Sequence, residues 1–229
     1  MKRISITILL SILLITSYAQ NESMMNLVTF DMKPIHFGFI LGLNSMSFST
    51  KVKPNDTLLT AVPKPQSGFE IGITADIRLA SHLNLRFIPG LSFGTRKIDF
   101  TLRQPDGSIE TVTKTAESTL LDFPLYLKYK TDRLTNFRAY ALAGAQYSID
   151  LASQSKKKED NIELLKINPH NFQFIIGGGT DFYLKYFKFG IELRMAYGLN
   201  DITTRRGTVF DKNLQYIKSK IFWIVFTFE

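Results

Sequence analysis

Apolar and polar residues alternate with a period of two through eight long segments of the chain. These segments cover residues 35–49, 68–80, 83–103, 117–130, 136–151, 171–184, 187–199 and 215–229. Successive side chains of a β-strand point to opposite faces, so this period predicts strands with one apolar and one polar face. None of the segments has the 3.6-residue period of an amphipathic helix.

The segment 68–80 illustrates the pattern. Its apolar face is formed by Phe69, Ile71, Ile73, Ala75, Ile77 and Leu79. Its polar face is formed by Glu70, Gly72, Thr74, Asp76 and Arg78. The other segments repeat this division, which predicts a sheet that is apolar on one side and polar on the other.

The connections between the segments alternate in length. Long polar loops are expected near 51–67, 104–116, 152–170 and 200–214, and short turns near 80–82, 131–135 and 185–186. Strands joined in this way form an up-and-down meander, which can close into a barrel. Two barrels fit: a soluble lipocalin-like barrel with an apolar cavity, and an outer-membrane barrel with an apolar face toward lipid.

The positions of the glycines favour the membrane barrel. If Leu184 pairs with Phe187 across the turn, Gly179 faces Glu192 and Gly177 faces Arg194. Small residues opposite long charged ones suit a crowded interior, whereas glycine in a water-facing strand only weakens it. Aromatic residues near the strand ends also suit the interfacial girdles of a membrane barrel. They are Phe37, Phe48, Phe69, Tyr129, Phe182, Phe187, Tyr197 and Phe228.

The predicted fold is therefore an all-β, eight-stranded antiparallel up-and-down transmembrane β-barrel in the cell outer membrane, in contact with its lipid. Its charged side chains need partners inside the barrel, so we expect a structural polar network in the lumen. A three-residue turn at 80–82 would pair Asp76 with Arg86 in this network. The expected members are Glu70, Asp76, Arg78, Arg86, Asp122, Lys128, Arg138, Asp181, Glu192 and Arg194.

Two prolines fit a closed barrel badly. Pro89 and Pro124 lie inside predicted strands, and a closed barrel has no free edge to accommodate them. We expect a β-bulge at each.

The first residues have a different character. Lys2 and Arg3 precede an apolar run at 4–15, and the small residues Ser17 and Ala19, separated by one residue, resemble a cleavage site. This pattern predicts a signal peptide over 1–19, then a short periplasmic segment over 20–34 and the barrel over 35–229. An N-terminal membrane anchor is the alternative, but the run is shorter than a bilayer requires. The formal charge of +8 permits contact with anionic lipid headgroups. Nucleic acid is not expected as a partner of an exported protein.

No motif indicates catalysis, a cofactor or a metal. The chain has no cysteine, and no Gly-x-Ser-x-Gly motif accompanies its three histidines, His36, His82 and His170. The glycines at 177–179 lead into a turn and another strand, so they do not form a phosphate loop before a helix. We therefore expect a protein that is not an enzyme, although a lipid-modifying enzyme with a site at the barrel rim is an alternative.

Three stretches resemble the PorT family of outer-membrane barrels from Bacteroidota. They are "KPIHFGFILGLN" (33–44), "LLDFPLYLKYK" (120–130) and "GGGTDFYLKYFKFGIELRMAYGLN" (177–200). The resemblance implies a component of the type IX secretion system, with other secretion components as partners and a possible link to gliding motility. It brings no catalytic residues. A general outer-membrane scaffold or adhesin without a secretion role remains the main alternative.

Overall fold

The computed structural model describes residues 25–53, 58–153, 167–204 and 214–229. The predicted signal peptide at 1–19 lies outside the described residues, as does much of the expected loops at 152–170 and 200–214. A short 3₁₀ helix, η2 (Phe30–Met32), precedes ten antiparallel strands. The strands are β1 (Ile35–Val52), β2 (Leu58–Lys64), β3 (Gln66–Arg78), β4 (Leu83–Phe87), β5 (Gly90–Arg103), β6 (Ile109–Lys130), β7 (Phe137–Asp150), β8 (His170–Tyr183), β9 (Lys188–Gly198) and β10 (Leu214–Phe228).

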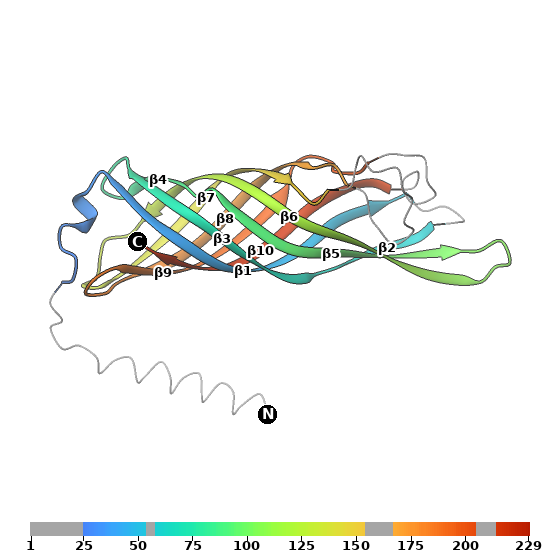
Figure 1. The fold of residues 1–229 in the computed structure, drawn as a ribbon, viewed down its shortest axis with the longest axis horizontal. Coiled ribbons are helices and arrows are strands. Elements are labelled where there is room, and N and C mark those ends of the chain that lie inside the picture. Colours follow the sequence, from blue (N-terminus) through green and yellow to red (C-terminus); the bar gives the residue numbers. More distant parts are fainter. Residues whose placement is uncertain (1–24, 54–57, 154–166, 205–213) are drawn as a thin grey trace, which may run out of the picture.

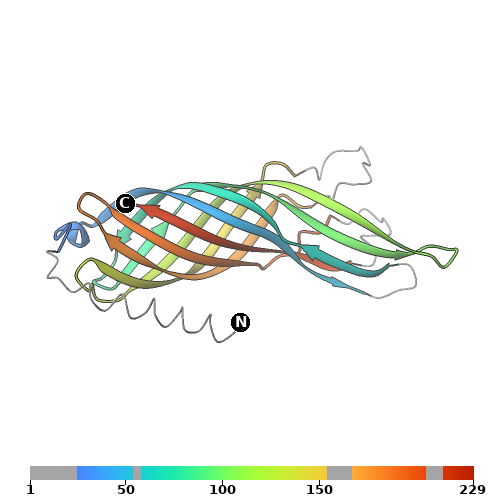
Figure 2. The ribbon, with the colours of Figure 1, turned by 90° about the horizontal axis from the view of Figure 1, so that it is seen from below.

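The strands form one sheet that closes on itself. Strand β1 pairs with β10 on one side and with β3 on the other, and β3 pairs with both β4 and β5. Strand β2 pairs with β5, both β4 and β5 pair with β6, and the other pairs follow chain order from β6 to β10. Figures 1 and 2 show the resulting elongated barrel from two directions.

The barrel has two different ends. At the turn end, the short connections 79–82, 131–136 and 184–187 lie beside η2 and the last residues of β10 (Figure 1). At the loop end, β5 and β6 continue together as a hairpin that projects beyond the other strands (Figures 1 and 2).

The two prolines interrupt pairing without producing bulges, so that prediction is wrong. Strands β4 and β5 are separated at residues 88 and 89, yet both keep one register with β6, from Leu83 opposite Tyr129 to Gly90 opposite Asp122. The register of β6 with β7 is also unbroken at Pro124. Ile88 and Pro124 face each other, because the Ile88 N–H donates to the Pro124 carbonyl. The ladder is therefore interrupted at residues 88 and 89, where a proline lies on each of the two neighbouring strands and cannot donate a backbone hydrogen bond.

Two expected loops are largely strand. Residues 58–64 form β2, which pairs with β5, and β6 begins at Ile109 after a tight turn. The turn is closed by hydrogen bonds between Gln104, Gly107 and Ser108, and Gly107 adopts a positive φ of 85°. The exposed residues of these outer strand segments are mixed, with Thr60 and Lys64 beside Val62 on β2, so the segments lack the apolar outward face of the other strands.

The outer surface between the two ends is an apolar belt, which agrees with the predicted faces. Its exposed large side chains include Phe39, Leu41, Leu43, Ile71, Ile73, Leu125, Leu127, Phe174, Ile176, Ile191, Leu193, Phe222 and Ile224. The belt ends toward the loop end, where Leu43 is followed on the outward face of β1 by Ser45 and Ser47. On β10 the same change occurs between Phe222 and Lys220.

Beyond the belt the interior becomes apolar. A buried cluster there comprises Phe48, Leu58, Ile98, Phe100, Ala116, Ile167, Ile202, Leu214 and Ile217. Phe48 was expected in an outward girdle, but it lies on the inward face of β1 with Met46 and is buried. The outer part of the barrel is therefore a small packed core with a water-facing surface.

No helix among the described residues is long and apolar enough to cross a bilayer.

Candidate functional site

The interior of the barrel inside the apolar belt holds a network of buried ion pairs beside a buried apolar cluster that includes Ile40, Trp223 and Val225. Arg86 on β4 is the centre of this network, and its side chain is fully buried. It donates from Nε and Nη2 to Asp76 (2.9 and 2.7 Å), from Nη1 to Glu192 (3.2 Å) and from Nη2 to Glu229 (2.7 Å). The expected pairing of Asp76 with Arg86 is present in the strand register. One guanidinium thus joins β3, β4, β9 and the residue after β10.

Two lysines extend this centre toward the turn end. Lys128 on β6 donates to Asp181 on β8 (2.9 Å), and its Nζ lies 3.7 Å from the ring centroid of Tyr140. Lys188 forms an ion pair with Glu229 (2.6 Å) and lies 3.8 Å from Asp181. These groups are buried, so each charge depends on its neighbours rather than on water.

A second arginine extends the network toward the loop end. Arg194 donates to Glu70 (2.7 Å) and to the Tyr126 hydroxyl (2.9 Å), and it lies 3.1 Å from Glu192. The Tyr140 hydroxyl donates to Glu192 (2.8 Å). Glu192 therefore links the two arginine centres into one continuous network.

Asp122 is buried but held differently from the prediction. It accepts hydrogen bonds from Ser92 (2.7 Å), Ser148 (2.6 Å) and Gln146 (2.8 Å). Hydroxyl and amide donors therefore satisfy this carboxylate, and no described ion pair involves it.

Arg78 does not belong to the network, which corrects the prediction. It is the last residue of β3, at the rim of the turn end, and its side chain is exposed. Alternation gave it the inward direction, but at a strand end the wall no longer encloses the side chain, so the guanidinium reaches water.

Arg138 contributes to a cap over the turn end instead of to the central network. It donates to Asp31 (2.8 Å), which also accepts a hydrogen bond from the Tyr183 hydroxyl (2.9 Å). Phe30 stacks on His36, with ring centroids 4.2 Å apart. Residues 25–34 thus close the barrel mouth, and we call this segment the N-terminal cap.

Several buried charges were missed by the sequence prediction. They are Lys188 and Glu229, already placed in the network, Lys130, and the pair Arg96 and Asp150, in which Arg96 donates to Asp150 (2.8 Å). Each continues the alternation of its own strand by one or more steps, as Lys188 does with Gly190 and Glu192. Extending the period to the strand ends would have found them.

The glycines facing this network are required by close approach. Gly179 lies opposite Glu192 and Gly177 opposite Arg194, as predicted. A Cβ at Gly179 would lie 2.5 Å from the Ile191 carbonyl oxygen and 2.7 Å from the Tyr140 hydroxyl. The absence of a side chain there lets Tyr140 reach Glu192.

His82 has a serine and an acid as neighbours, but without the burial of a catalytic triad. His82 contacts Ser81 (3.0 Å, through Nδ1) and Asp132 (2.9 Å, through Nε2), which is a serine–histidine–acid set on the surface. The Asp132 side chain is 92% exposed, whereas the acid of a catalytic triad is buried where it can orient the imidazole. Among the described residues, no group of three or more acidic or histidine side chains is placed to hold a metal ion.

Comparison with known proteins agrees with this architecture. Residues 18–204 match the model of a family described as "Outer membrane protein beta-barrel domain". No curated protein matches the chain.

Three solved structures are among those similar to the chain. Neisserial surface protein A (NspA) is 9% identical, with a TM-score of 0.44 over 85% of this chain and 98% of that one. OprG from Pseudomonas aeruginosa is 14% identical, with a TM-score of 0.45 over 84% and 93%. The N-terminal β-barrel domain of OprF from the same organism is 13% identical, with a TM-score of 0.33 over 82% and 96%.

Proposed function

Because the chain belongs to the outer membrane protein beta-barrel domain family, we propose that it is a sealed, non-enzymatic outer-membrane barrel that serves as an accessory component of a type IX protein secretion system. The location in the outer membrane follows from the family. The sealed interior and the secretion role are the proposal.

We further infer that the barrel is eight-stranded. Strands β2 and β3 are successive pieces of one barrel strand interrupted at Pro65, and β4 and β5 are successive pieces of another interrupted at Pro89. Support comes from β5, which pairs with β2 and then β3 along its length. An eight-stranded barrel has an interior just wide enough for side chains to fill.

The observation behind the sealed interior is the contact of Arg86 with three carboxylates, Asp76, Glu192 and Glu229. Opening a passage along the axis would separate these charges in a low-dielectric interior, at a cost of several kcal/mol for each broken pair. The N-terminal cap adds a second closure at the turn end. Such a barrel does not conduct a polypeptide, so a role in export is an accessory one.

The orientation follows from the connections. Outer-membrane barrels have short periplasmic turns and longer extracellular loops. On this basis the turn end and the N-terminal cap face the periplasm, and the projecting β5–β6 hairpin faces outward from the cell. A secretion partner would then meet the barrel on its lipid-facing belt or at the loop end.

The secretion role is supported by the resemblance of 33–44, 120–130 and 177–200 to the PorT family. The test is deletion of the gene followed by measurement of secreted cargo proteins in the medium. We expect cargo to be retained in the cell and export to return when the native chain is supplied on a plasmid. Unchanged secretion in the deletion strain would refute the role.

A second candidate is an adhesin, and the β5–β6 hairpin favours it because this element extends furthest from the barrel (Figure 1). Replacing residues 103–109 by Asn-Gly shortens the hairpin tip and leaves the pairing of Leu102 with Glu110. An adhesin would lose surface attachment with secretion intact. If the protein is a secretion component whose partner binds elsewhere, the shortened variant would retain both secretion and surface attachment.

A further inference from the structure

A strip of lysines lies on the outer surface directly beyond the apolar belt. Lys218 and Lys220 are successive outward residues of β10, and Lys51 lies on the outward face of β1. The register places Ser49 opposite Lys218 and Ser47 opposite Lys220, so two hydroxyl side chains lie among the three lysines. We call Lys51, Lys218 and Lys220 the lysine strip.

The lysines of this strip are not neutralised by the protein. Among the residues that the structure describes, none of the three forms an ion pair with a carboxylate. Asp201 approaches the same wall, but its carboxylate accepts hydrogen bonds from the backbone N–H groups of Thr203 and Ile217. Elsewhere at this level Lys64 is paired with Asp99 (3.3 Å). Side chains at successive outward positions are roughly 7 Å apart, so the strip presents closely spaced positive charge.

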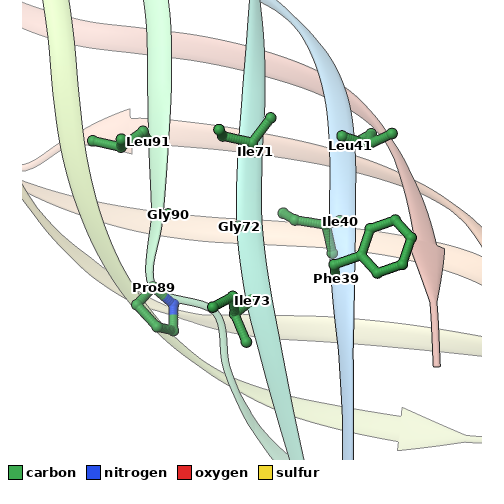
Figure 3. A pocket seen from close by; sticks show the side chains of 9 residues that line it. All are labelled: Phe39, Ile40, Leu41, Ile71, Gly72, Ile73, Pro89, Gly90 and Leu91. Atoms are coloured by element: carbon green, nitrogen blue, oxygen red, sulfur yellow. The ribbon is translucent and has the colours of Figure 1, made fainter.

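The belt beneath the strip contains an apolar hollow. It has a volume of about 450 Å³ and lies on the outer surface of β1, β3 and β5 (Figure 3). Side chains of Phe39, Leu41, Ile71, Ile73 and Leu91 surround it, and Gly72 and Gly90 also line it. It lies beside the gap at Pro89, where the wall is interrupted (Figure 3).

We propose that the lysine strip and the hollow together bind one phosphorylated lipid of the outer leaflet. Its phosphates lie between Lys218, Lys220 and Lys51, and one acyl chain runs down β1 into the hollow. Ser47 and Leu41 are six residues apart on one outward face, which spans roughly 20 Å along the strand. That distance suits an acyl chain descending from the interface into the bilayer core.

Charge selects this occupant over others. Clustered lysines at a membrane surface attract anionic headgroups, and each contributes about the same increment to binding. A neutral lipid would leave the three ammonium groups without an anionic partner, and a partner protein's apolar segment would fill the hollow without using the strip. The proposal does not depend on the secretion role, because it concerns only the surface that meets lipid.

The test compares two double variants of the full chain in neutral detergent. Lys218→Gln with Lys220→Gln removes two charges from the strip. Lys33→Gln with Lys185→Gln removes two exposed charges at the turn end, and Lys185 lies over Tyr186 much as Lys218 lies over Tyr216 (5.5 and 5.4 Å). Binding of a bis-phosphorylated, acylated glycolipid and of its dephosphorylated form is measured by native mass spectrometry.

We expect the strip variant to bind the phosphorylated lipid about 30-fold more weakly and the turn-end variant to bind it as the parent does. Equal binding by both variants, or equal losses, would overturn the headgroup site. Leu91→Trp fills the hollow and should weaken binding several-fold, and unchanged binding would overturn the acyl-chain placement. Displacement of the lipid by an equal concentration of inorganic phosphate would show that a free anion is the ligand, which also contradicts the proposal.

Discussion

Arg86→Met tests whether the interior ion network stabilises the barrel. The side chain makes four hydrogen bonds to three carboxylates, and all of these groups are buried. Removing one partner of a buried pair costs about 3–5 kcal/mol, because the other charge remains without compensation. The loss of stability is not three times this value, because each carboxylate keeps another partner. These partners are Asn84 for Asp76, Tyr140 for Glu192 and Lys188 for Glu229. We therefore expect the free energy of unfolding to fall by about 3–5 kcal/mol.

Arg78→Met is the matched control, because Arg78 is an arginine of the neighbouring strand whose side chain is exposed. A surface substitution of this kind changes stability by about 0.5 kcal/mol or less. Both variants are refolded into lipid vesicles and titrated with urea, and the folded fraction is measured from the mobility of unboiled protein on a gel. If the two variants unfold within about 1 kcal/mol of each other, the network does not stabilise the barrel. Adding Asp76→Asn to Arg86→Met should restore part of the loss, because it removes one uncompensated carboxylate.

Two further predictions concern the glycines and the N-terminal cap. Gly179→Val places a side chain against Ile191 and Tyr140 and should reduce the free energy of unfolding by about 1–3 kcal/mol. The side chain of Gly178→Val points toward lipid and should reduce it much less. Urea titration in vesicles compares the two variants, and equal reductions would contradict the assigned faces. Asp31→Asn weakens the contacts of the cap with Arg138 and Tyr183, so amide hydrogen exchange in residues 25–34 should accelerate. Asp106→Asn in the hairpin turn is the control, and similar exchange in both variants would show that Asp31 does not hold the cap.

The faces and much of the register were predictable because they depend on local rules. A two-residue period fixes which side chains share a face, and a short turn fixes the pairing of its flanking strands. That is why Asp76 faces Arg86 and Gly179 faces Glu192 in both the sequence reading and the structure.

The remaining features depend on where the wall ends and what surrounds it. Arg78 occupies an inward position of the alternation but lies at the rim, where its side chain is exposed. Phe48 also occupies an inward position, and there it packs in the apolar core beyond the belt. Strand β2 exposes Thr60 and Lys64 as well as Val62, so it lacks the apolar outward face that identified the other strands in the sequence. The accommodation of Pro89 and Pro124 requires knowing the register of β4 and β5 with β6, which places Ile88, the residue before Pro89, opposite Pro124.

Quenching of tryptophan fluorescence by brominated acyl chains tests the central assignment most directly. Trp223 is the single tryptophan of the chain, and it is buried on the inward face of β10, between the outward residues Phe222 and Ile224. In vesicles of brominated lipid we predict weak quenching of the native protein. The variant Trp223→Phe with Ile224→Trp moves the indole to the other face and should be strongly quenched. Strong quenching of native Trp223, with weak quenching of the variant, would mean that the faces are reversed and that the ionic network does not lie inside.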